Sequence, residues 1–391
     1  MKQRVFLRRE AERLIANRTY TIYSKWIERV EAARPGDWVE VRDWRGELVG
    51  EGFYEGIGAV GVRVMHFEHE HLDPEVVMEE RIEQAYRRRR HLARSWDGYR
   101  LVNADGDGLP GLVIDVYRRT AVLQSSSIGM DRYVSYVAEA LVREGIAERV
   151  YIKNDHRGRR EAGLPPYKGW AVGEGEPRES IAEADVIFNV DFEKGQKTGF
   201  FLDQRVNRIN MTEFAQGRVL DLFTYTGGFA VHMLRAGAEE AVLVDESAYA
   251  VREAVGNLRA NGLAGRAQVI NARVEDVLEA LLRRGERFDV VIADPPALIP
   301  SRELYGRGRA KYRRLYEDVF KVVSRGGLVF ASSCSYFLSA EEFRQLLAEA
   351  AEAAGRSVVY IGGHWGISPD HVYRPVDREL NYLKAHLLEV E

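Results

Sequence analysis

Short apolar runs alternate regularly with amphipathic helical patterns from about residue 190 to the C-terminus, and this alternation constrains the fold most. The strand-like runs include RVLDLF, EAVLVDE, AQVINAR, FDVVIADPP and GGLVFASS, and patterns such as AYAVREAVGNLRANGL lie between them. Such alternation predicts a parallel sheet covered by helices on both faces. In such sheets, ligands bind outside the carboxyl ends of the strands. We therefore expect the functional residues where the strands end.

Acidic residues close the successive predicted strands, and a cysteine follows the fifth. Asp221, Asp245 and Asp294 end the first, second and fourth strands, Asp276 follows the third, and Cys334 lies just past the fifth. One such Asp is more often a helix cap. Four acids and a thiol at successive ends of one sheet predict a binding site instead. An acid ending the second strand can accept hydrogen bonds from two ribose hydroxyls.

The glycine loop after the first of these strands bears on the cofactor. A dinucleotide needs the spacing G-x-G-x-x-G to bring the backbone close to its pyrophosphate. The loop reads FTYTGGF, in which Gly227 and Gly228 allow a tight turn into a helix. NAD is therefore the weaker interpretation. S-adenosylmethionine carries no phosphate, so a looser loop suffices beneath its methionine part.

The preceding sequence has a different organisation. Residues 1–68 show strand alternation and turn glycines, typical of a small, mostly β barrel or sandwich. A charged amphipathic helix over about 72–95 leads into a mixed region of strands and a helix. We predict three domains: 1–68, a central α+β domain at 69–189, and the strand–helix domain at 190–391.

Composition limits the setting and the partners. The single cysteine rules out an intrachain disulfide, which suits a reducing cytoplasm, and no apolar run approaches a signal peptide or a membrane span. We therefore predict a cytoplasmic protein that binds no membrane. The formal charge of −4 argues mildly against a nucleic-acid partner. Arginine clusters at 86–91, 156–160 and 306–314 could each be ordinary surface, but together they favour RNA.

Several motifs, in the expected order, resemble one family, the RlmI-type ribosomal RNA cytosine-5 methyltransferases. The matching segments are GQKTGFFLDQR (195–205), LDLFTYTGGFA (220–230), DPPA (294–297), SCS (333–335) and YLK (382–384), with KNDHRGRREAGLP (153–165) in the centre. The resemblance implies an α/β fold with a C-terminal Rossmann-like class I methyltransferase domain. It also implies an N-terminal PUA-like RNA-binding domain, a small central α+β domain and a homodimer.

The resemblance also implies site residues, with no metal among their ligands. S-adenosylmethionine would be bound by Asp203, Gln204, Arg205, Asp221, Phe223, Thr226, Gly227, Asp245, Asp276 and Asp294. RNA, which the resemblance identifies as 23S ribosomal RNA, would be contacted by Pro295, Pro296, Arg157, Arg159, Arg160 and His371. One departure weakens the assignment of His371 and its neighbour Asp370: the family usually has Pro directly after Asp-His, and this chain has Val372.

The implied reaction gives Cys334 a role as nucleophile and Asp294 a role beside it. Carbon 5 of cytosine is a weak nucleophile, and addition of a thiolate to carbon 6 activates it. Adjacent strands lie about 4.8 Å apart, so Asp294 and Cys334 would flank one base, held in register by Asp294 and the Pro295 carbonyl. Such a base must be unpaired or flipped out.

Other functions remain open on the residues alone. The DPP motif could instead accept the amine hydrogens of adenine or guanine for exocyclic-amine methylation, which needs no thiol. A dehydrogenase is a further enzyme hypothesis. A non-catalytic RNA-binding ribosome assembly factor is the alternative outside enzymes, although the intact acids and thiol argue against it.

Overall fold

The computed structural model describes residues 2–67 and 71–391 of the chain. Among these residues, the strands form sheets of six, five, two and seven strands. The chain divides into two compact units. The first comprises 1–181, 190–202 and 369–380, and the second comprises 182–189, 203–368 and 381–391. Neither unit is one continuous stretch of sequence, so the predicted boundary at 189/190 does not coincide with a single division here.

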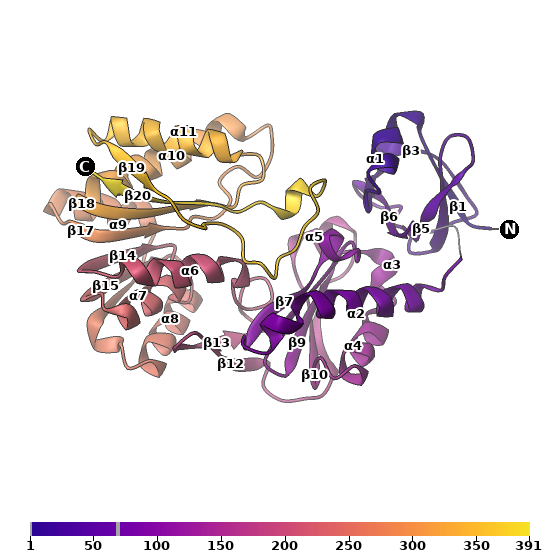
Figure 1. Cartoon of the computed structure of the whole chain (residues 1–391), viewed down its shortest axis with the longest axis horizontal. Coiled ribbons are helices and arrows are strands. Elements are labelled where there is room, and N and C mark those ends of the chain that lie inside the picture. The colour runs from indigo at the N-terminus through magenta and orange to yellow at the C-terminus, as the bar shows by residue number, and fades with distance from the viewer. Residues whose placement is uncertain (1, 68–70) are drawn as a thin grey trace. The chain divides into compact units, whose positions relative to one another are not determined.

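The second unit is built on the seven-stranded sheet, in the order β16-β15-β14-β17-β18-β20-β19 (Figure 1). Its strands are β14 Arg218–Leu222, β15 Glu240–Asp245, β16 Ala267–Asn271, β17 Phe288–Ala293, β18 Val323–Ser333, β19 Val358–Ile361 and β20 Lys384–Val390. The strands β14 to β18 pair in parallel. The chain order reverses between β14 and β17, which is the position where such sheets bind ligands.

Helices cover both faces of this sheet, as the alternation predicts. One face carries α9, α10 and α11, and the other carries α6, α7 and α8 (Figure 1). These helices are α6 Arg205–Met211, α7 Gly228–Ala236, α8 Ala248–Ala260, α9 Val274–Arg284, α10 Tyr305–Val322 and α11 Ala340–Ala353. Buried apolar side chains such as Leu220, Val291, Val329 and Phe343 join the sheet to α9, α10 and α11 in one core. Burial on both faces explains why the strands read as continuous apolar runs.

The last strand departs from the predicted parallel sheet. Strand β20 lies between β18 and β19 and runs antiparallel to both. Its pairing with β18 extends from Gly327 opposite Val390 to Ser333 opposite Lys384. The antiparallel direction brings the start of β20 to the edge of the sheet where β18 ends. This edge is the one predicted to carry the site.

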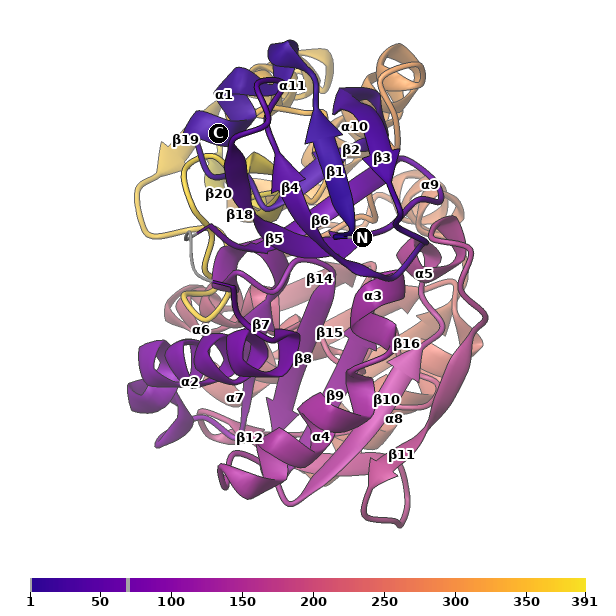
Figure 2. The same ribbon diagram turned by 90° about the vertical axis from the view of Figure 1, so that its right-hand side faces the viewer.

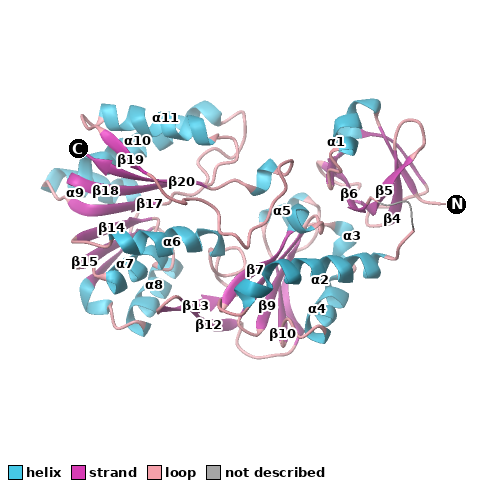
Figure 3. Cartoon of the chain, viewed as in Figure 1, coloured by secondary structure: helices cyan, strands magenta, loops and turns pink. Residues whose placement is uncertain are grey.

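The first unit begins with the six-stranded sheet, in the order β2-β6-β5-β4-β1-β3, with the short helix α1 Glu12–Ala16 (Figure 3). The strands are β1 Arg4–Leu7, β2 Thr21–Tyr23, β3 Ile27–Glu31, β4 Trp38–Arg42, β5 Leu48–Tyr54 and β6 Val60–His66. All its pairings are antiparallel except that of β1 with β4. Val5, Val39, Val62 and Val64 form its small core. The mostly β character predicted for this stretch is confirmed.

The unit continues with a five-stranded sheet, in the order β11-β10-β9-β8-β7. The strands are β7 Gly98–Asn103, β8 Leu112–Tyr117, β9 Thr120–Ser125, β10 Arg149–Asn154 and β11 Tyr167–Val172. The predicted linker forms helix α2 Pro74–Ala93, which packs with α4 Val134–Arg143 on one face of this sheet (Figure 2). The short helices α3 Ile128–Asp131 and α5 Arg157–Glu161 complete the elements of this unit. The hairpin of β12 Arg178–Glu183 with β13 Val186–Asp191 is shared, because residues 182–189 belong to the second unit.

Residues 369–380 belong to the first unit although the flanking sequence belongs to the second. The buried Arg89 guanidinium donates to the Asp370 carbonyl at 2.9 Å and to both carboxylate oxygens of Asp107 at 2.7 and 2.9 Å. A Cβ atom on residue 106 would lie 2.0 Å from the Val372 carbonyl oxygen. Only glycine at position 106 therefore lets the segment 369–380 approach this closely. The domain range 190–391 predicted from alternation did not anticipate this return of the chain.

No helix in the described ranges, 2–67 and 71–391, has the length and apolar character needed to cross a membrane.

Candidate active site

Asp221, at the end of β14, anchors the glycine loop instead of facing solvent. Its side chain is buried, and one carboxylate oxygen, Oδ2, accepts from the Thr224 hydroxyl at 2.6 Å and from the Ala230 N–H at 3.1 Å. Burial, assisted by the negative charges of Asp294 and Asp245 and opposed by the two hydrogen bonds, raises the pKa of Asp221 to about 7. The carboxylates are therefore close enough to act on one another.

The loop from Asp221 into α7 is held in an unusual backbone conformation. Phe223 and Tyr225 have positive φ angles of 60° and 51°, and Gly227 has a φ of 83°. Non-glycine residues rarely adopt this left-handed region, and such strain concentrates at functional sites. The loop is retained because its neighbours fix it: the Tyr225 N–H donates to Asp245 at 2.9 Å, and the Asn257 amide donates to the Thr226 carbonyl at 2.9 Å.

Asp245 is half-buried at the end of β15, as predicted. Its two carboxylate oxygens accept the backbone N–H groups of Tyr225, at 2.9 Å, and Ser247, at 2.8 Å. Each carboxylate oxygen has a second lone pair. This carboxylate can therefore hold the loop and still accept hydroxyl groups of a ligand. Asp276 is exposed in the first turn of α9.

The segment 203–205 lies in the same unit, with its side chains buried. The Tyr382 hydroxyl donates to the Asp203 carboxylate, and Gln204 accepts from the Asn207 amide at 2.6 Å. The Arg205 guanidinium lies 3.4 Å from the fully buried carboxylate of Glu183. Arg208 and His232 contact the same carboxylate, and the arginines hold the pKa of Glu183 well below its usual range against the effect of burial. Glu183 is thus a partner of Arg205 that motif matching did not find.

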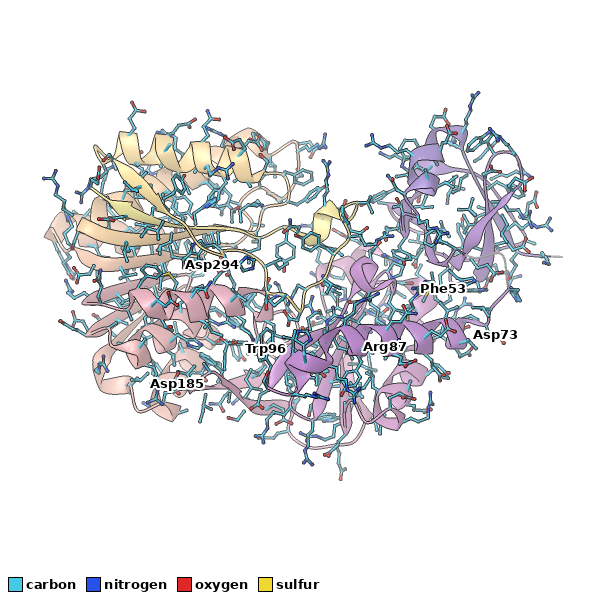
Figure 4. The ribbon with its side chains drawn as sticks, viewed as in Figure 1. Phe53, Asp73, Arg87, Trp96, Asp185 and Asp294 are labelled. Carbon is cyan, nitrogen blue, oxygen red and sulfur yellow. The ribbon has the colours of Figure 1, made fainter. Side chains whose placement is uncertain are left out.

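Cys334 and Asp294 lie where two hydrogen-bonded strands end. Strands β17 and β18 pair in parallel up to Ala293 opposite Ala331, so Asp294 is one residue beyond one strand end and Cys334 one residue beyond the other. The Ser332 hydroxyl donates to the Asp294 carboxylate, and Cys334 Sγ lies 3.9 Å from the Pro295 carbonyl oxygen. Figure 4 labels Asp294 at this edge of the sheet. Both side chains are half-buried, and Pro295 is buried while Pro296 is exposed.

Two tyrosines of α10 fix the strand ends from beneath. The Tyr312 hydroxyl bonds the Ser335 hydroxyl at 2.9 Å and accepts from the Ser333 hydroxyl at 3.1 Å. The Tyr316 hydroxyl donates to the Ser332 carbonyl at 2.7 Å. Burial raises the pKa of both phenols, so they remain neutral hydrogen-bonding groups. The spacing of four residues places them on one helix face, a signal that the sequence contained but that resembled ordinary core packing.

Of the predicted RNA contacts, Pro295 and Pro296 belong to the second unit, and Arg157, Arg159, Arg160 and His371 belong to the first. Arg157 and Arg160 are exposed on α5. Arg159 is buried, and its guanidinium binds both carboxylate oxygens of Asp131 and the Pro165 carbonyl. This arginine therefore holds α5 in place and offers no free surface charge. His371 is also buried, with Nδ1 2.9 Å from the Asp370 carboxylate, which accepts the Arg100 N–H at 2.7 Å.

The other arginine clusters divide in the same way. In 86–91, Arg87 is exposed, whereas Arg89 is buried against Asp107. On α10, Arg309 pairs with Glu349, while Arg307, Lys311 and Arg314 are exposed. These three cations lie at positions i, i+4 and i+7 of the helix, and the charge of Arg314 acts on the carboxylate of Glu317. Fewer arginines of these clusters are therefore exposed and unpaired than the sequence alone suggests.

The geometry suits S-adenosylmethionine. Acidic side chains gather at the strand ends, where they can accept ribose hydroxyls and balance a positively charged sulfur, and the adjacent loop has no phosphate-binding spacing. Fold and site together define an S-adenosylmethionine-dependent methyltransferase. The family model with that description matches residues 147–361, and a PUA-like domain model matches residues 5–67.

Comparison with individual proteins narrows this class. Ribosomal RNA large subunit methyltransferase I of Photobacterium profundum is 35% identical over 98% of both chains, and that of Serratia proteamaculans is 32% identical over the full length of both. The solved structure "A putative sam-dependent methyltransferase from Streptococcus mutans" covers both chains fully, with a TM-score of 0.84 at 20% identity, and so supports the fold. The chain belongs to the ribosomal RNA large subunit methyltransferase I family. The predicted fold class, family resemblance and cofactor are confirmed.

Proposed function

We propose that this protein methylates carbon 5 of a cytosine in ribosomal RNA through a covalent bond to Cys334. The observation that carries the proposal is the position of Cys334 and Asp294 just beyond the ends of the neighbouring strands β17 and β18. A thiol and a carboxylate so arranged can act on opposite sides of one small planar ring. Full-length relatives named as ribosomal RNA large subunit methyltransferases support RNA as the substrate.

In the proposed reaction, the Cys334 thiolate bonds to carbon 6 of the cytosine. The electron pair of the 5,6 double bond would then be available at carbon 5 to form a bond to the methyl group, while the bond from the methyl group to the donor's positively charged sulfur would break and leave that sulfur as a neutral thioether. Loss of the carbon 5 proton restores the double bond and breaks the carbon–sulfur bond, which returns the thiolate. The covalent adduct divides one difficult step into easier ones.

The remaining residues bind and orient. When bound, S-adenosylmethionine supplies the methyl group on a positively charged sulfur. Asp245 would accept its ribose hydroxyls, and the loop at Thr226 and Gly227 would lie beneath its methionine part, with Asp203, Gln204 and Asp276 as further candidates. Asp221 supports that loop from inside. The Pro295 carbonyl, 3.9 Å from the Cys334 sulfur, and Asp294 would hydrogen-bond the edge of the base.

Three further features support RNA binding. The PUA-like domain belongs to a class of RNA-binding modules, and Arg157 and Arg160 offer exposed charge in the same unit. Tyr336, two residues after Cys334, is an exposed aromatic side chain on which a neighbouring base could stack. We keep a cytoplasmic location, the choice of 23S ribosomal RNA and the homodimer as predictions.

A methyl-transfer assay with mapping of the product tests this function. We expect the protein to transfer label from S-adenosylmethionine to unmodified large-subunit ribosomal RNA, and we expect nucleoside analysis to identify 5-methylcytidine. Cys334→Ala should abolish the transfer. A labelled exocyclic amine, formed equally by the Cys334→Ala variant, would instead support the alternative use of the DPP motif.

A further inference from the structure

Lys384 begins β20 directly opposite the end of β18. The antiparallel register pairs it with Ser333, the residue before Cys334. Its Nζ donates to the Ser335 carbonyl at 2.6 Å and to the Tyr382 carbonyl at 2.7 Å. Lys384 therefore contacts both neighbours of Cys334: its backbone pairs with Ser333, and its ammonium binds Ser335.

This arrangement places a part-buried cation beside the nucleophile's turn. Burial, opposed by the negative charges of Cys334 and Glu342, lowers the pKa of Lys384 to about 8. The other ionisable groups that act at this turn are Tyr312 and Tyr316 on α10, whose raised pKa values keep them neutral, and Asp294, one residue beyond β17. Lys384 thus supplies positive charge beside Cys334.

We propose that Lys384 is a positioning residue for the nucleophile, whose ammonium stabilises Cys334 as the thiolate and holds its turn through the Ser335 carbonyl. A positive charge close to a thiol favours the ionised form, and the thiolate is the form that attacks carbon 6. The cation loses part of its hydration on burial, and the two carbonyl contacts compensate for this loss. Neither the motif YLK nor the family model assigns this task to the lysine.

The inference rests on the proposed covalent role of Cys334, but its test requires no RNA. Cys334 is the only cysteine of the chain and is half-buried, so alkylation by iodoacetamide reports one thiol. The alkylation rate of the full-length protein is measured from about pH 5 to pH 10, a range that brackets an ordinary thiol pKa of about 8.5. Lys384→Gln keeps a donor for the Ser335 carbonyl and removes the charge. Lys384→Arg keeps the charge, and Lys384→Met removes both charge and donor.

We expect Lys384→Gln and Lys384→Met to raise the apparent thiol pKa by about one unit, with about tenfold slower alkylation near pH 7, and Lys384→Arg to remain close to the wild type. Cofactor affinity and melting temperature identify any variant that fails to fold. Identical profiles in the wild type and in a folded Lys384→Gln variant would overturn the proposal. An equal shift in Lys384→Gln and Lys384→Arg would also overturn it, because loss of the turn would then explain the effect. If the wild type fails to methylate RNA but the thiol pKa rises as expected in Lys384→Gln, the proposed function is refuted and the role of Lys384 is not.

Discussion

At the scale of single residues, the buried Asp221 makes the stability of the fold depend on pH. Its pKa of about 7 in the folded chain lies above the value of about 3.9 in an unfolded chain. Between these values the folded chain holds a proton that the unfolded chain has lost. Stability therefore falls as pH rises through this window, by at most about 1.4 kcal/mol per pH unit from this group, and levels off above pH 7.

Replacing Asp221 by Asn should remove this loss of stability at higher pH, because the Asn side chain carries no charge. Both hydrogen bonds to Asp221 reach the same oxygen, so an Asn oxygen can accept them in its place. We expect Asp221→Asn to raise the free energy of unfolding relative to wild type more at pH 8 than at pH 5, measured by urea denaturation without cofactor. A difference between the two proteins that does not change with pH would contradict the raised pKa.

Asp245 should matter for cofactor binding far more than for RNA binding. Loss of hydrogen bonds to a charged group costs about 1.5–3 kcal/mol, which is roughly a ten- to hundredfold loss of affinity. We expect Asp245→Ala to weaken S-adenosylhomocysteine binding by this factor in calorimetry. Asp185→Ala is the control, because Asp185 is an exposed acid of the same unit, 3.7 Å from Arg235 and labelled away from the sheet edge in Figure 4. An unchanged dissociation constant for Asp245→Ala would remove Asp245 from the cofactor site.

Single residues also show what a sequence can and cannot predict about a site. Asp245, Asp294 and Cys334 were found because strand periodicity fixes where each strand ends. The burial of Arg159 could not be found, because its partner Asp131 is distant in sequence and pairing depends on the tertiary fold. Lys384 was read as part of a strand motif, since its register against Ser333 appears only when β20 pairs with β18.

At the scale of elements, helix α5 offers a test of RNA binding that the burial of Arg159 sharpens. Arg157 is exposed and pairs with Glu161 at 2.6 Å. We expect the double change Arg157→Glu and Arg160→Glu to lower RNA affinity and to flatten its salt dependence by about 0.7 in slope for each lost phosphate contact. Cofactor affinity should not change. Filter binding at several salt concentrations measures the RNA affinity and its salt dependence.

The turn between β8 and β9 supplies the matched control for α5. Arg118 and Arg119 are exposed, and Arg119 pairs with Glu148 at 2.6 Å, as Arg157 does with Glu161. Arg118→Glu with Arg119→Glu makes the same change in net charge. Equal losses of RNA affinity in the two double variants would mean that overall charge, and not α5, governs binding.

Elements also mark the limit of the fold prediction. The strands and helices after residue 190 were predicted because burial on two faces imposes long apolar runs and because amphipathic helices alternate with them. The direction of β20 was not predicted, since an apolar run carries no sign of whether it pairs in parallel or antiparallel. The return of residues 369–380 to the first unit depends on contacts such as Arg89 with Asp370, which link residues 281 positions apart.

At the scale of the whole molecule, the two units carry different parts of the proposed activity. The PUA-like domain and α5 belong to the first unit, and the strand ends with Asp245, Asp294 and Cys334 belong to the second. Methylation of RNA would require both parts in the full chain. A covalent adduct with substrate therefore tests RNA binding, base recognition and the nucleophile in a single experiment.

The adduct can be trapped by fluorine at carbon 5. After the Cys334 thiolate has bonded to carbon 6 and the methyl group has been transferred, the last step requires loss of a proton from carbon 5. Fluorine cannot leave as a cation, so the carbon–sulfur bond should persist. We expect target RNA containing 5-fluorocytidine, incubated with the full-length protein and S-adenosylmethionine, to give a cross-linked species on a denaturing gel. Peptide mapping should locate the link at Cys334, the only thiol in the chain.

Variants of Cys334 separate covalent catalysis from simple binding. Cys334→Ala should give neither adduct nor methylation but retain cofactor affinity, because a half-buried side chain beyond a strand end contributes little to packing. Cys334→Ser should be nearly inactive, since an unassisted hydroxyl is a much weaker nucleophile than a thiolate. Full methylation by Cys334→Ala would refute the covalent mechanism. An adduct that maps to another residue would refute the assignment of the nucleophile while leaving covalent chemistry in place.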